Sequence, residues 1–174
     1  SNLDTQIHTR ALLVWLRIST WSARKYDRTV TNKVNAQYAA SSDAGRYNKH
    51  LLPGDAKAYK ALVTLAGSIR AAHYNHTLAW SDEGWRLLPT ANYQSYTTWL
   101  REKQREFSSA LNTFGSEYPH LRTQARILLN GMYRDEDYPS ELDIRSRFAL
   151  AVEYSPVPAA GDLRVDLASD QITM

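Results

Sequence analysis

The segment Thr90–Gly115, TANYQSYTTWLREKQREFSSALNTFG, carries the clearest periodicity in the chain. Large apolar and aromatic side chains recur at helical spacing among polar residues, a pattern that predicts an amphipathic helix with one buried face. Thr90 is placed to cap this helix and Gly115 to end it. The predicted buried face consists of Tyr93, Tyr96, Leu100, Phe107, Leu111 and Phe114.

Further helices are predicted on both sides of this segment. A second helix is expected from Ser116 to Asn130–Gly131, antiparallel to the first, because Asn-Gly is a common stopping pair. A four-residue period predicts a helix over 21–40, and Ser140 followed by Asp143 resembles a capping box for a short helix that ends near Arg147. The remaining helix, over 55–76, is predicted from the apolar stripe Tyr59, Leu62, Val63, Ala66 and Ile69.

Strands are predicted near the two ends of the sequence. Residues 9–19 are rich in β-branched, aromatic and leucine side chains, and apolar residues alternate in 148–154 and again in 163–167. The segment 81–89 is expected to be a loop. The sequence therefore predicts a single α+β domain over 1–174, with a bundle of four to five helices packed on a small antiparallel sheet that the N-terminal strand and a C-terminal hairpin form. An almost all-helical fold is the alternative.

Composition limits the classes of protein that the chain can belong to. Of its 174 residues, 43% are hydrophobic and 22% charged, which is ordinary globular usage. There is no cysteine, so disulfides, thiolate zinc sites and cysteine nucleophiles are excluded. The longest apolar run, Ala11–Leu16, is too short to cross a membrane, so we expect a cytoplasmic protein with no membrane partner.

Four stretches together carry a resemblance to a known family. They are SSDAGRYNKHLLP (41–53), HYNHTLAWSDEGWRLLPTANY (73–93), ARILLNGMYRDEDYPS (125–140) and DLRVDL (162–167). In these the chain resembles a family of uncharacterised bacteriophage early-gene proteins, and the similarity spans nearly its whole length. The resemblance implies a phage or prophage protein in a bacterial host, encoded near replication and recombination functions. It implies no catalytic residues.

The charge distribution predicts a surface for nucleic acid. Between Arg10 and Lys60 ten lysines and arginines stand against three acids, a balance of +7, and since the whole chain carries +3 the remainder carries −4. Cations of this segment could neutralise phosphates, and aromatic rings among them could stack on bases. The predicted nucleic-acid-binding residues are Arg24, Lys25, Arg28, Lys33, Arg46, Tyr47 and Lys49, with Tyr26, Trp80 and Trp85 as further stacking candidates.

Two function classes follow from these patterns. The first is a non-enzymatic protein that binds nucleic acid, single-stranded DNA above all, in replication or recombination. The alternative is a protein-interaction module, such as an inhibitor or adaptor acting on a host defence or replication protein. Trp85 and Arg86 would contact that partner, because tryptophan and arginine are the usual interface hot spots. The competing interpretation of the aromatic residues is that they fill the core.

Catalytic and metal-binding patterns are weak in this sequence. His73 and His76 share a helix face near Asp82 and Glu83, which could make a metal site, although a structural role at a helix end is the simpler interpretation. The acidic run Asp135–Asp137 raises the question of a two-metal nuclease, but the three acids are contiguous rather than spread over several elements. No nucleophile elbow or phosphate-binding glycine loop occurs, so no enzyme activity, metal or cofactor is expected.

Overall fold

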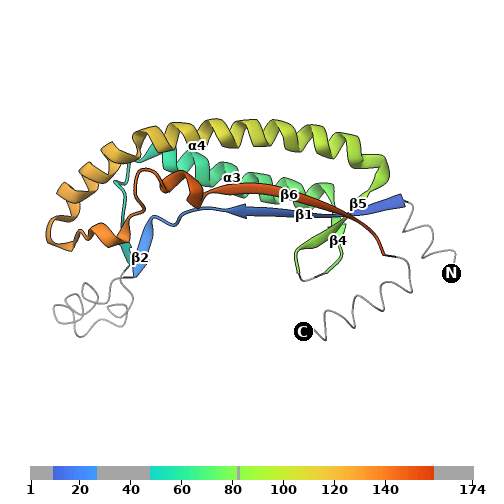
Figure 1. Cartoon of the computed structure of the whole chain (residues 1–174), viewed down its shortest axis with the longest axis horizontal. Helices are drawn as coiled ribbons and strands as arrows, with labels where there is room; N and C mark the ends of the chain where they lie inside the picture. The colour runs from blue at the N-terminus through green and yellow to red at the C-terminus, as the bar shows by residue number, and fades with distance from the viewer. Residues whose placement is uncertain (1–9, 27–47, 82, 159–174) are drawn as a thin grey trace. The chain divides into compact units, whose positions relative to one another are not determined.

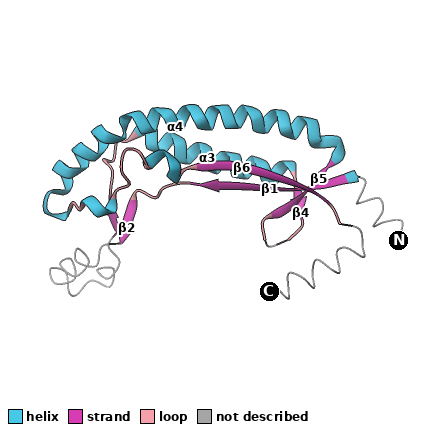
Figure 2. Cartoon of the chain, in the orientation of Figure 1, coloured by secondary structure: helices cyan, strands magenta, loops and turns pink. Residues whose placement is uncertain are grey.

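The computed structural model describes residues 10–26, 48–81 and 83–158. Its secondary structure is shown in Figures 1 and 2. The described part contains two α-helices, and three-residue or four-residue 3-10 turns lie at 90–92, 130–132, 135–137 and 144–147. The helices and strands are β1 (Ala11–Ser19), β2 (Arg24–Tyr26), β3 (Asn48–His50), α3 (Lys57–His76), β4 (Leu78–Ala79), β5 (Trp85–Pro89), α4 (Tyr93–Leu129) and β6 (Ala149–Pro156).

The predicted bundle of four to five helices is wrong, because the described residues form only α3 and α4. In a broad sense the fold is α+β. The two helices expected over 90–115 and 116–130 are one continuous helix, and the capped segment after Ser140 forms only the 3-10 turn Ile144–Arg147. In the predicted helix over 21–40, residues 24–26 are a strand, and the rest lies outside the described residues.

Gly115 does not end α4. The guanidinium of Arg145, the far end of a flexible side chain, passes so close over this position that a Cβ there would displace it. On either side, the buried rings of Phe114 and Tyr118 hold the helix against the core. Pro119 is also accommodated inside α4, so neither residue that disfavours a helix interrupts it.

Contact clustering divides the chain into two compact units, and α3 and α4 each contribute to both. We call the first the sheet unit (Ser1–Ile18, Ala66–Glu106 and Leu150–Met174) and the second the ribbon unit (Ser19–Leu65 and Phe107–Ala149). The prediction of a single domain stays a prediction.

The sheet unit is built on a four-stranded sheet with the order β4-β5-β1-β6. The segment 81–89, predicted to be a loop, instead supplies β5, which pairs antiparallel with both β1 and β4. The second strand predicted for a C-terminal hairpin, 163–167, lies outside the described residues. Within this unit, the parts of α3 and α4 that belong to it lie along one side of the sheet in Figure 1, and α4 packs on the sheet through a buried cluster. That cluster consists of Val14, Leu88, Tyr96 and Leu100, with Leu16, Trp99 and Val152 against it.

The ribbon unit has a core of aromatic rings below a two-stranded antiparallel ribbon, β2–β3. Trp21 makes edge contacts with Tyr59 and Tyr118, at ring-centroid distances of 6.1 and 5.9 Å. Tyr138 Oη donates a hydrogen bond of 2.6 Å to the carbonyl of Leu51. These contacts join the first turns of α3, the second half of α4 and the chain after it into one core, and they fix where the ribbon begins and ends.

Candidate nucleic-acid interface

The β2–β3 ribbon sorts its side chains onto two faces. Arg24 pairs with His50, Lys25 with Lys49, and Tyr26 with Asn48. Because side chains alternate along a strand, Arg24, Tyr26, Asn48 and His50 share one face and the two lysines share the other. We call these the outer face and the inner face of the ribbon.

The inner face is occupied by one carboxylate. Lys25 Nζ lies 2.7 Å from Asp137 Oδ1, and Lys49 Nζ lies 2.7 Å from Asp137 Oδ2. The contact at Oδ2 is an ion pair more than an aligned hydrogen bond, and Lys49 also donates 2.8 Å to the carbonyl of Met132. The side chains of Lys49 and Asp137 are 0% and 2% exposed, so this ion pair is held inside the protein.

Asp137 keeps its charge because its two partners outweigh its burial. Burial would raise the pKa of this carboxyl, but the close contacts and positive charges of Lys25 and Lys49 lower it below its usual value. A buried ammonium beside a neutral acid would be strongly unfavourable, so the pair is charged in the folded protein. Lys49 therefore supports the ribbon from inside and offers no charge to solvent.

The outer face presents cations to solvent instead. Arg24 and His50 are both exposed, and within the described ranges no carboxylate lies at ion-pair distance from either. Tyr26, on the same face, is 51% exposed. Lys60, in the first turn of α3, adds a second exposed cation, whose ammonium donates to the carbonyl of Gly54.

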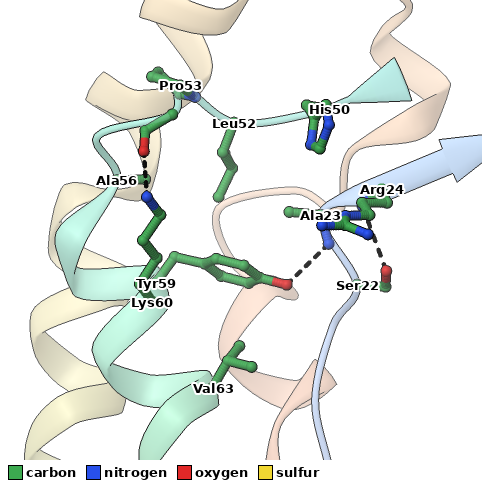
Figure 3. A pocket seen from close by; sticks show the side chains of 11 residues that line it. Ser22, Ala23, Arg24, His50, Leu52, Pro53, Ala56, Tyr59, Lys60 and Val63 are labelled. Carbon is green, nitrogen blue, oxygen red and sulfur yellow. Dashed lines mark hydrogen bonds between the residues drawn. The ribbon is translucent and has the colours of Figure 1, made fainter. Parts of the chain in front are cut away.

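A pocket with a volume of about 660 Å³ lies among these side chains (Figure 3). Arg24 and Lys60 supply its charged groups and His50 an imidazole ring, and no aspartate or glutamate of the described chain lines it. Its remaining walls are mostly apolar. They are formed by Ser22, Ala23, Leu52, Pro53, Gly54, Ala56, Tyr59 and Val63.

The structure thus separates the cations that the sequence grouped together. Arg24 lies on the outer face, Lys25 is half-exposed but paired with Asp137, and Lys49 is buried. The other four predicted residues, Arg28, Lys33, Arg46 and Tyr47, lie outside the described residues, so their role stays a prediction.

Sequence reasoning missed His50 and Lys60 as members of the site. Both belong to the basic segment Arg10–Lys60, and His50 directly follows Lys49 in the sequence. A strand over 48–50 would have assigned His50 to the face opposite Lys49. Lys60 could have been assigned from the helix over 55–76, where it lies next to the apolar stripe at Tyr59 and outside it.

Trp85 and Arg86, the predicted partner-binding residues, have partners within the sheet unit. Trp85 lies opposite Trp15 on β1, with ring centroids 5.5 Å apart. Arg86 Nε donates 2.7 Å to Thr77 Oγ1, and its guanidinium lies 4.3 Å from the ring centroid of Tyr74. Neither contact tests whether another protein binds here, so this role stays a prediction.

Trp80, the other tryptophan considered for base stacking, lines a separate hollow of the sheet unit. It shares this hollow with Tyr74 and Arg86, and its own side chain is half-buried. The structure therefore places it outside the ribbon unit, which holds the outer face.

The two histidines considered as metal ligands belong to an aromatic cluster of the sheet unit. His73 Nδ1 is 2.9 Å from Tyr96 Oη, and the His76 ring lies 4.8 Å from that of Trp99. Burial, with the nearby charges of Arg86 and His76, lowers the pKa of His73 to about 4. Among the described residues no group of three histidine or acidic side chains is placed to hold a metal ion. Asp82, the third residue considered, is outside them.

The acidic run at 135–137 is divided among different cations. Asp135 is paired with Arg122 at 3.2 Å and with Arg126 at 3.4 Å, whereas Asp137 faces the inner lysines. Glu136 Oε1 lies 4.0 Å from Arg134. Carboxylates that point to separate partners do not converge on one position, as a two-metal site would need.

Comparison with known proteins adds no relative. No family model, no curated protein and no solved structure matches this chain. The described helices also include none with the length and apolar character needed to span a bilayer.

Proposed function

We propose that this chain binds single-stranded nucleic acid, without catalysing a reaction on it, through the outer face of the ribbon. The observation that carries the proposal is the arrangement of Arg24, His50 and Lys60 around one pocket that no described carboxylate lines. Arg24 and Lys60 supply this pocket with positive charge, which is what phosphate groups require. Exposed Tyr26 adds a ring on which a base can stack.

The inner face supports the same assignment by contrast. Asp137 pairs with both Lys25 and Lys49, so these two lysines of the ribbon face a carboxylate of the protein, whereas Arg24 is directed to solvent. Single-stranded substrate is favoured over duplex because an exposed tyrosine and an apolar hollow can accept only unstacked bases. Action in the cytoplasm of a bacterial host, in phage replication or recombination, is part of the proposal and rests on the sequence resemblance alone.

Salt dependence of oligonucleotide binding tests this function. A labelled single-stranded DNA should bind in a fluorescence anisotropy titration, and the logarithm of its association constant should fall against log salt with a slope of about −1.4. This slope follows from roughly 0.7 per neutralised phosphate for two cations, Arg24 and Lys60. The double substitution Arg24→Glu with Lys60→Glu should weaken binding at least about tenfold at low salt, since it replaces two attractions by repulsions.

A matched control is available on α4. Arg101 is exposed and lies in the sheet unit, so Arg101→Glu changes net charge by as much as either single substitution but leaves the outer face intact. Its affinity should stay within about twofold of the unmodified chain, as expected for a remote charge that salt screens. Binding that is absent at low salt, or that the control weakens as much as Arg24→Glu, would remove the proposal.

A further inference from the structure

The pocket on the outer face is lined mostly by apolar groups, which a phosphate alone would not contact. Its volume, about 660 Å³, falls within the range of small-molecule sites, and most of its lining is apolar. A site that served only to hold a phosphate would need donors and no apolar floor. The apolar part of the pocket therefore calls for an apolar part of the ligand.

Tyr59 gives this floor a fixed shape. Its hydroxyl donates 2.8 Å to the carbonyl of Trp21 and accepts 3.0 Å from the backbone N–H of Ala23. Figure 3 shows its ring crossing the site between Leu52 and Val63. Because the hydroxyl is satisfied inside the protein, the ring offers its apolar surface to the pocket, and a preformed wall lowers the entropic cost of binding.

The charged groups define the other end of the ligand. Arg24 and His50 come from the ribbon and Lys60 from α3, so the pocket has cations from two different elements. A ligand that fits has an anionic end and a flat apolar end. Nucleic acid supplies both in each of its units, since every base has a face that stacks on an aromatic ring.

From this complementarity we infer that the pocket takes one nucleotide unit, with its base against Tyr59, Leu52 and Val63 and its phosphate at Arg24 and Lys60. The inference rests on the proposed function and adds a specific place for one base. In a single strand a base can leave its neighbours at small cost, so the unit can belong to a bound strand or be a free nucleoside monophosphate.

The first test compares three ligands by isothermal titration at one ionic strength. Adenosine monophosphate should bind at least about tenfold more tightly than inorganic phosphate, because stacking and burial add to the ionic contact. Ribose 5-phosphate should behave like phosphate. Equal affinities for all three would show an anion site without a base pocket, which would overturn the inference.

Amide chemical shifts provide a readout that needs no variant. Adenosine monophosphate should shift the signals of 50–54 and 56–63, and inorganic phosphate should shift fewer of them, near Lys60. Signals of the sheet-unit part of α4, 93–106, serve as the internal reference. Shifts that are confined to other parts of the chain would contradict the assignment.

A pocket-filling variant separates this inference from the proposed function. Val63 is half-buried, so Val63→Trp should fill the apolar end, abolish mononucleotide binding and weaken a single-stranded oligonucleotide roughly tenfold. An unchanged circular dichroism melting curve shows that the variant folds; if it does not fold, Ser22→Trp fills the same pocket from an exposed position.

The remaining outcomes distinguish the two claims. Oligonucleotide binding that survives both variants unweakened would overturn the base pocket and leave the proposed function in place. Mononucleotide binding without any oligonucleotide binding would overturn the proposed function, and the pocket would then serve free nucleotides. Competition of the mononucleotide with the oligonucleotide supports the strand as the source of the unit.

Discussion

The sheet unit and the ribbon unit both bury polar side chains, but those of the sheet unit are neutral and those of the ribbon unit are charged. In the sheet unit His73 is buried next to Tyr96, and its lowered pKa keeps it neutral. In the ribbon unit Lys49 and Asp137 are equally buried and remain charged as a pair. A neutral cluster needs no counter-ion. The buried ion pair places the carboxylate of Asp137 on the inner face, so the cations of the outer face remain open to a ligand.

The largest effect is expected from breaking the ionic cluster. Asp137→Asn takes the carboxylate charge away from the buried ammonium of Lys49, and removing one partner of a buried ion pair typically costs about 3–5 kcal/mol. Urea unfolding should show this loss, and the second substitution Lys49→Met should restore much of it because no buried charge remains. A loss below about 1 kcal/mol for Asp137→Asn would mean that the pair contributes no more than an exposed one.

Acid should affect the two clusters in separate pH ranges. Unfolded His73 gains its proton near pH 6.5 and folded His73 only near pH 4, so the unfolded state binds more protons between these values. Stability should therefore fall as pH drops from 6.5 to 4, by up to about 3 kcal/mol from the size of the pKa shift. His73→Asn should flatten this part of the urea-unfolding profile; an unchanged slope would contradict the assignment.

Asp137 should contribute only at lower pH. Its folded pKa lies below the ordinary 3.8, so the stability that it provides is present above pH 3.8 and is lost as pH falls through the folded value. Asp137→Asn should therefore leave the slope between pH 6.5 and 4 unchanged. Guanidinium or urea titrations at four or five pH values, on both variants, separate the two contributions.

Replacing a glycine by alanine should affect stability differently in the two units, and both changes should be smaller than that of Asp137→Asn. Gly84 in the sheet unit has φ +99°, and a Cβ there would lie 2.8 Å from Trp15 Nε1, so Gly84→Ala should cost about 1–3 kcal/mol. Gly115 in the ribbon unit meets only the flexible end of Arg145. There the gain in helix propensity, up to about 1 kcal/mol, offsets the contact. Equal losses in thermal unfolding would contradict this distinction.

The sequence predicted the periodic parts of the fold well. The apolar stripe from Tyr59 to Ile69 marks α3 within two residues at its start, and the density of Leu, Val and Ile marks β1. Gly115 was wrongly predicted to end a helix, because the side chain that lies over it, Arg145, comes from 30 residues further along the chain. The strand at Arg24–Tyr26 was missed because a weak four-residue period was taken as helical, and pairing with Asn48–His50 decided the local structure instead.

The candidate site was only partly accessible to sequence reasoning. Composition indicated the basic segment that contains Arg24 and Lys49, but charge counts do not distinguish a buried cation from an exposed one. The partner of Lys49 is Asp137, 88 residues away, and no local pattern links them. Sequence reasoning favoured Lys49 over His50 as a binding residue, because the charge count takes histidine as neutral at pH 7. In the ribbon, however, His50 is exposed and lines the pocket, whereas Lys49 is buried.

The most direct measurement compares two neighbours on one strand. Arg24→Ala and Lys25→Ala each remove one positive charge from β2, but the first changes the outer face and the second the inner face. For a labelled single-stranded DNA at low salt, we expect Arg24→Ala to weaken binding at least about fivefold and Lys25→Ala to stay within about twofold. Equal losses, or a larger loss for Lys25→Ala, would contradict the account.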